Sequence, residues 1–204
     1  MQAIDNPAIA QMEQRYRATF INSLWGFRPL ALIGTCNQEK RTNLAIFNSL
    51  VHIGANPPLF GLVVRPDSVD RHTLDNIRER KEFTVNLVGK DFVAQAHQTS
   101  ARYPKDVSEF EATGLETEWK EGIDVPFVLK SSIQIHAKLV EEHSLAINGT
   151  EFLIAQVSTI YIHPSCIGAD GFVDHLSAQT AAGIGLDAYY APELIMRLPY
   201  AKPK

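Results

Sequence analysis

Two segments of this chain carry residue types that could bind a flat, phosphorylated ligand. Residues 42–49, Thr-Asn-Leu-Ala-Ile-Phe-Asn-Ser, interleave small and amide side chains with apolar ones, which lets a backbone approach a planar ligand and donate hydrogen bonds to it. Residues 71–77 place Arg71, His72 and Thr73 at the start of a predicted helix, where free N–H groups and the helix dipole favour phosphate. Together, the two segments predict a site for a heteroaromatic phosphate.

Each segment also has an ordinary explanation when it is taken alone. An amide-rich strand is most often a plain edge strand, and basic residues at a helix start usually form a solvated surface. His97 and Arg102, on a second predicted helix, could attract the phosphate of a pyridine nucleotide, although a solvated helix face is the commoner reason for such residues.

The histidines and cysteines predict neither a metal site nor a disulfide framework. Five histidines have no short metal-ligand spacing among them: His52, His136, His143, His163 and His175. The two cysteines, Cys36 and Cys166, lie far apart and belong to no Cys-x-x-Cys pair. We therefore expect no metal and two reduced thiols, as is usual in the cytoplasm.

The composition is that of a soluble globular protein. The 204 residues are 45% hydrophobic and 21% charged, which fits neither a disordered chain nor a membrane protein. A net charge of −4 gives no general attraction for nucleic acid or anionic lipid. Neither a signal peptide nor a membrane-spanning apolar run is evident, so we expect a cytoplasmic protein with one domain over residues 1–204.

Short apolar runs separated by turn residues predict a β-rich barrel with few helices. Strands are expected at 30–36, 42–53, 59–64, 83–88, 132–140 and 152–162, and helices at 7–24, 73–82 and 92–102. Asp67, Ser68 and Asp70 are candidate caps for the second helix. Asn148-Gly149 favours a type I′ hairpin turn between the last two strands.

Two peripheral segments could serve the site or an interface. Residues 1–24 form a helical extension whose apolar face could pack on the barrel or on a second subunit. Residues 103–126 are acidic and irregular, and we interpret them as a long surface excursion, either a substrate cover or plain surface decoration.

The order of these motifs along residues 27–87 resembles the flavin reductase-like, FMN-binding split-barrel family. The resemblance is carried by 28–33 (Arg-Pro-Leu-Ala-Leu-Ile), 42–49, 56–59 (Asn-Pro-Pro-Leu), 71–77 and 82–87 (Glu-Phe-Thr-Val-Asn-Leu). The later strands, the hairpin and residues 185–190 are similar only in outline. The resemblance implies a β-rich α+β fold: a split, Greek-key-like barrel with a few peripheral helices.

Carried over residue by residue, the resemblance assigns a flavin site. Thr35 and Cys36 would lie beside the flavin or its ribityl chain, and Asn48 and Ser49 beside the polar edge of the ring. Asn43, Leu44 and Ala45 would line the ribityl-phosphate side, and Arg71, His72 and Thr73 would hold the phosphate. Members of the family often have Lys-Asp-Thr at 71–73, so the role of His72 is open.

The resemblance also implies an activity that needs no catalytic side chain, because the flavin N5 carries the redox chemistry. The expected protein is a homodimeric oxidoreductase that contains FMN rather than FAD and accepts a hydride from NADH or NADPH. The electrons would pass to free flavin, a partner monooxygenase or another acceptor. The N-terminal helix, the acidic excursion and Tyr189/Tyr190 would cover the subunit interface.

Two other functions remain open at this point. One is a flavin-binding electron-transfer or storage module without efficient nicotinamide turnover. The other is a split barrel that has lost flavin and serves as an interaction domain.

Overall fold

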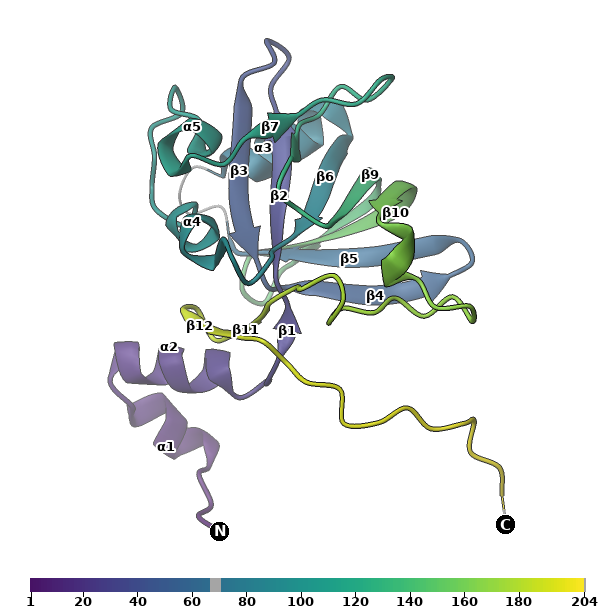
Figure 1. The fold of residues 1–204 in the computed structure, drawn as a ribbon. Coiled ribbons are helices and arrows are strands. Elements are labelled where there is room, and N and C mark those ends of the chain that lie inside the picture. The colour runs from purple at the N-terminus through teal and green to yellow at the C-terminus, as the bar shows by residue number, and fades with distance from the viewer. Residues whose placement is uncertain (67–70, 204) are drawn as a thin grey trace.

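A seven-stranded antiparallel sheet dominates the computed structural model, which describes residues 1–66 and 71–203 (Figure 1). The strand order is β3-β2-β6-β9-β10-β5-β4. The strands are β2 (Ala31–Cys36), β3 (Thr42–Phe47), β4 (Leu50–Ala55), β5 (Pro58–Val64), β6 (Glu82–Leu87), β9 (Ile133–Leu145) and β10 (Thr150–Ile162). The expected β-rich architecture is confirmed.

The two edge strands of this sheet are consecutive in sequence, so the sheet must curl on itself. β3 and β4 are separated only by Asn48 and Ser49, yet they form opposite edges. The Ser49 hydroxyl donates to the Val63 carbonyl at 2.7 Å, and the Val63 amide donates back to the Ser49 carbonyl at 3.2 Å. The prediction of one continuous strand over 42–53 is therefore wrong, because these bonds turn the chain from one edge to the other.

Helix α3 (His72–Arg80) closes the barrel interior. Leu74 and Ile77 are fully buried in the same cluster as Ile33, Leu62 and Phe83 from the strands. A second cluster lies on the outer side of β2 and β3, under α4 (Val93–Gln98) and α5 (Glu109–Thr113). Strand β3 therefore lies between two apolar layers, with one long edge unpaired by any strand among the described residues.

The N-terminal extension is two helices, α1 (Asn6–Gln11) and α2 (Gln14–Ser23), so the prediction of one helix over 7–24 is wrong. The Glu13 carboxylate accepts the Tyr16 amide at 2.9 Å and starts α2, while Met12 is extended. A side-chain cap inside the apolar pattern thus breaks the helix. Every residue of α1 and α2 is at least partly exposed.

The acidic segment 103–126 is packed structure, and the prediction of an irregular surface excursion is wrong. It contains α5 and β7 (Thr117–Glu118), and β7 pairs with β8 (Phe127–Val128). Phe110 and Leu115 join the cluster under α4 and α5, and Ile123 and Val125 pack with Cys36 in another cluster. Because these apolar residues are spaced singly among acidic ones, the segment has no periodic pattern although it is anchored in the core.

Helix α4 and the β9–β10 hairpin are both present, but each differs in detail from its prediction. Helix α4 ends four residues before the predicted Arg102, where the Thr99 hydroxyl donates to the Ala96 carbonyl at 2.7 Å. The β9–β10 hairpin has a four-residue loop, 146–149, in which only Gly149 has positive φ (+69°). The hairpin is confirmed, but the type I′ turn is wrong, because that turn needs positive φ at two residues.

The C-terminal region forms a small second sheet. β11 (Ala182–Ile184) pairs with β12 (Ala188–Tyr190) and with β1 (Arg28–Pro29), and a 3₁₀ turn, η1 (Pro164–Cys166), follows β10. Beyond β12, residues 191–203 extend away from the barrel (Figure 1). In the described ranges, no helix is long and apolar enough to cross a membrane.

Candidate functional site

A buried polar cluster joins the start of α3 to strands β2 and β3. The Asn43 amide nitrogen donates to the hydroxyls of Thr35 at 3.1 Å and Thr73 at 3.0 Å. The Asn76 amide nitrogen donates to the same Thr35 hydroxyl at 3.1 Å. All four residues are buried, so their polar groups depend on one another. This cluster fixes the position of the first turn of α3 against the start of β3.

The unpaired edge of β3 presents backbone donors and acceptors. In an antiparallel pair, successive residues turn their N–H and C=O groups alternately toward and away from the neighbouring strand. The Leu44 amide points away from β2, since it donates to the Glu109 carboxylate at 2.9 Å. The same alternation places the Leu44 carbonyl and the Ile46 amide on this edge. Leu44 has no exposed surface, so a planar ligand could reach this edge at the half-buried Ile46, whose amide is a donor.

Glu109 is a buried carboxylate that no sequence motif indicated. Burial raises the pKa of its carboxyl above the ordinary value, opposed by the Leu44 hydrogen bond and by the nearby His72. Its neighbour Ser108 shares a hydrogen bond of 2.7 Å with the Thr42 hydroxyl. The pattern Ser108-x-x-Glu111 is a helix-start signature that could have revealed α5.

At the other end of β3, side chains bind the C-terminal hairpin. The Asn48 amide nitrogen donates to the Gly185 carbonyl at 2.8 Å. Tyr189, in β12, has its hydroxyl 2.6 Å from Nδ1 of His97 on α4. Burial raises the pKa of the Tyr189 hydroxyl. The end of β3 is thus enclosed by β12 and α4, while Ala45 remains half-buried in the strand.

The first turn of α3 borders a small polar recess of about 20 Å³. Its lining includes His72, Arg41 and Lys105, together with the amides of Asn37, Asn43 and Asn76. Arg71 caps the helix through its backbone and donates from Nη2 to the Pro66 carbonyl at 3.2 Å. The predicted caps Asp67, Ser68 and Asp70 lie outside the described residues. The recess combines three basic side chains with a helix N-terminus, which suits an anion.

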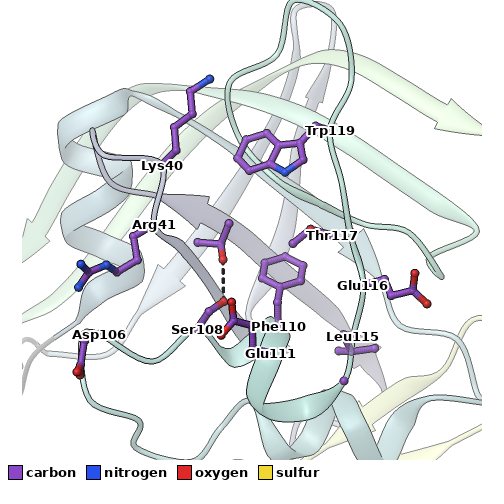
Figure 2. A pocket seen from close by; sticks show the side chains of 12 residues that line it. Lys40, Arg41, Asp106, Ser108, Phe110, Glu111, Leu115, Glu116, Thr117 and Trp119 are labelled. Atoms are coloured by element: carbon purple, nitrogen blue, oxygen red, sulfur yellow. Dashed lines mark hydrogen bonds between the residues drawn. The ribbon is translucent and has the colours of Figure 1, made fainter.

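A larger cleft of about 790 Å³ adjoins this recess and shares Arg41 and Thr42 with it. Figure 2 shows Trp119 and Lys40 on one side and Phe110, from α5, in the centre. The Lys40 ammonium lies 5.8 Å from the Trp119 ring centroid, a cation–π distance. The segment 103–126 therefore forms one wall of a cleft of ligand size.

Thr35 and Cys36 are placed behind the site and not at its surface. Both are fully buried, and the Cys36 thiol donates to the Asp124 carbonyl at 3.2 Å. Burial raises the pKa of that thiol. Since neither residue has exposed surface, both would support the site from behind.

The structure thus brings together Asn43, Leu44 and Thr73 at one end of β3, with Arg71 and His72 beside them. Asn48 and Ser49 lie at the opposite end of the strand. A ligand that used both ends would have to lie along the edge. Arg41, Lys105 and Glu109 are further residues of the site that the sequence did not indicate.

Comparison with known proteins matches residues 27–170 to the family model described as flavin reductase like domain. A split-barrel protein from Shewanella frigidimarina NCIMB 400, provisionally classed as a flavin reductase, is 46% identical. It superposes with a TM-score of 0.95 over 98% of this chain and 100% of its own.

A more distant solved structure shares the fold alone. Nitrilotriacetate monooxygenase component B from Bacillus cereus is 21% identical, with a TM-score of 0.84 over 97% of this chain and 98% of that one.

Curated relatives match a smaller region. An uncharacterized protein from Halalkalibacterium halodurans is 31% identical over 138 residues, which are 64% of this chain and 65% of the relative. An uncharacterized protein from Aquifex aeolicus is 27% identical over 114 residues, 55% of this chain and 58% of the relative. The chain thus spans about three fifths of the length of these two relatives.

Proposed function

Because this chain belongs to the flavin reductase-like family, we propose that it binds FMN along the open edge of β3 and acts as an NAD(P)H-dependent oxidoreductase. The observation that carries the proposal is the hydrogen bond between Asn43 and Thr73. This bond holds the open backbone edge next to an anion-binding helix start. FMN carries a planar ring and a phosphate joined by a flexible ribityl chain. The ring matches the strand edge, and the phosphate matches the helix start.

The ring would lie along the edge of β3, with the amide of the half-buried Ile46 as a donor. Such fixed backbone groups orient a ring and stabilise charge that develops on it. Ala45 has a small side chain, which permits close approach to the strand. Bound FMN would supply hydride acceptance and electron transfer, while the protein supplies orientation.

The phosphate would lie at the first turn of α3, held by Arg71, His72 and the backbone amides of that turn. Arg41 and Lys105 border the same recess and add positive charge. Because the recess measures about 20 Å³, these exposed side chains must turn outward to admit a phosphate. Thr73 would hold the turn in place through Asn43.

Several predicted contact residues take supporting roles in this proposal. Asn48 holds the C-terminal hairpin, and Ser49 holds the bend between β3 and β4. Thr35 accepts the two buried amides, and Cys36 packs with Ile123, Val125 and Phe127. These four predicted contact residues therefore shape the site without touching the ring through their hydrogen-bonding groups.

The wider proposal is a cytoplasmic homodimer with one domain over residues 1–204, in which NADH or NADPH reduces the flavin. The acceptor is free flavin or a separate oxygenase. The fold shared with a monooxygenase component supports the second acceptor, and the family supports the first.

A visible absorption spectrum of the purified protein tests flavin binding directly. We expect flavin bands and release of FMN on denaturation. Consumption of NADH or NADPH on addition of FMN and an electron acceptor then tests the reductase. A yellow protein without turnover would favour an electron-transfer or storage module. A colourless protein that takes up no added FMN would reject both and favour an interaction domain.

A further inference from the structure

The C-terminal arm, residues 191–203, exposes an unusual amount of apolar surface. The arm is extended and belongs to no helix or strand in the described part of the chain. Its large apolar side chains all face solvent: Leu194, Ile195, Met196, Leu198 and Tyr200. Ile195 is 90% exposed and Tyr200 is 93% exposed. Contiguous exposed apolar surface of this kind marks a site that another surface covers.

The arm is anchored at its centre to the body of its own chain. Arg197 Nη2 lies 2.5 Å from the Asp170 carboxylate, and the Arg197 guanidinium lies 4.0 Å above the centroid of the Phe172 ring. These contacts hold the arm at Arg197 and leave the apolar neighbours on both sides uncovered. The arm is therefore presented outward, not folded back over its own barrel.

The N-terminal extension also exposes apolar surface that the rest of its own chain does not cover. Its helices α1 and α2 pack so loosely that all their residues remain at least partly exposed, including Tyr16. The segment that follows exposes Leu24, Trp25 and Phe27. Phe27 meets Tyr190 edge-to-face, with ring centroids 5.0 Å apart, so the root of the arm adjoins the end of the helical extension.

Together, the arm and the extension expose nine large apolar side chains, each 54–93% exposed, and with roughly 150–250 Å² for an aromatic ring and somewhat less for an aliphatic chain this is on the order of 1,000 Å² per chain. A stable protein–protein interface needs about 800 Å² from each partner. Both surfaces lie on the same side of the barrel, with the helices and the arm projecting on either side of β1 (Figure 1). The exposed area therefore suffices for a dimer.

We propose that the arm of each chain packs on the helical extension of a second copy of this chain. A two-fold axis through the face between the helices and the arm places the arm of each chain on the helices of the other. The exposed apolar surfaces of the arm and of the helical extension are then both covered. A second copy supplies matching surfaces in equal number, which an unrelated partner would not. The inference rests on the homodimer in the proposed function and assigns the surface that forms it.

Single substitutions on the arm test this interface, with light scattering and sedimentation as the measurements. Ile195→Asp places a charge at a site that is exposed in the single chain, so the fold of each chain is kept. We expect the wild type to be dimeric and the variant dimer to dissociate at least 100-fold more readily. Ile147→Asp is the matched control, because Ile147 is 92% exposed on the β9–β10 loop. It should leave the dimer unchanged.

Inter-chain cross-linking tests which surfaces meet. The native thiols Cys36 and Cys166 are buried, so added cysteines can be oxidised selectively. A mixture of Ile195→Cys and Tyr16→Cys chains should form a disulfide between the two variants. Dimers that resist Ile195→Asp, or that form no mixed disulfide, would overturn the assignment of the arm while leaving the homodimer in place. A monomeric wild type would reject both, and flavin binding would keep its own spectroscopic test.

Discussion

The Asn43 amide nitrogen lies 3.0 Å from the Thr73 hydroxyl, and this contact joins the edge strand β3 to the first turn of α3. Both residues are buried, and the same amide nitrogen also donates to Thr35. A substitution at Thr73 should therefore disturb strand and helix together.

Thr73→Val keeps the shape of the side chain and removes the acceptor of the Asn43 amide. A buried donor without a partner costs about 1–3 kcal/mol, so we expect the free energy of unfolding to fall by that amount. FMN binding should weaken as well, because the helix start loses its register with β3. Urea denaturation and flavin titration measure the two effects. Thr117→Val, at an exposed position, should change stability by less than about 0.5 kcal/mol.

Arg71→Ala tests the proposed phosphate contact. Removing the guanidinium should weaken FMN binding by roughly 10-fold to 100-fold, since charge-assisted bonds to phosphate are lost. Riboflavin, which has no phosphate, should bind wild type and variant alike. Lys138→Ala removes an exposed cation from β9, and it should leave both affinities unchanged. An equal loss of FMN and riboflavin affinity would show that Arg71 stabilises the structure of the site and does not bind the phosphate.

Glu109→Gln tests how much the buried Glu109 carboxylate, next to β3, lowers the free energy of unfolding when it is ionised. Burial raises the pKa of this group in the folded state, so the stability it contributes is full below the ordinary Glu pKa and is lost as pH rises through the folded pKa. The variant keeps an acceptor for the Leu44 amide but does not titrate. Relative to wild type, it should gain stability as pH rises from about 4.3 toward neutrality.

Denaturation curves across that pH range measure the difference between Glu109→Gln and wild type. Glu111→Gln is the matched control, because Glu111 is an exposed residue of the same helix. Its difference from wild type should be nearly constant with pH. A Glu109→Gln difference that is equally flat would contradict the argument from burial.

The thiols provide a check on packing that is independent of any ligand. Cys36 and Cys166 are both buried, and burial raises the pKa of the Cys36 thiol, so little reactive thiolate is available. A thiol reagent at neutral pH should label neither residue in the native protein within minutes and both after unfolding. Ser100→Cys, at an exposed position, should react at once. Rapid native labelling of Cys36 would indicate that residues 123–127 detach from β2.

The sequence predicted the strands well, because their apolar runs are bounded by prolines, glycines and charged turns. It failed where a side chain bonds to the backbone within an apolar pattern. Ser49 splits one predicted strand into β3 and β4, and Glu13 splits one predicted helix into α1 and α2. Such local bonds leave hydrophobic periodicity unchanged, so a pattern cannot reveal them.

The candidate site was predicted in part. The segments around Asn43 and Thr73 were indicated by their residue types, and the structure places them in contact. Glu109 and Arg41 were not indicated, because their importance depends on a neighbour distant in sequence or on a shared recess. The acidic composition of residues 103–126 concealed the buried Phe110 and Leu115 that hold this segment against β3.

By itself, the sequence determined the β-rich class, the order of its motifs and the family they resemble, since these depend on residue type and local spacing. The tertiary structure alone decided which polar groups have partners inside the protein. Three of the side chains predicted to meet a flavin, Thr35, Asn43 and Thr73, are joined by hydrogen bonds to one another, and the edge of β3 that no described strand pairs is where we propose that the ligand lies. That edge exists because of the order in which the strands pair. Strand order depends on contacts between segments that are distant in sequence, so no local pattern predicts it.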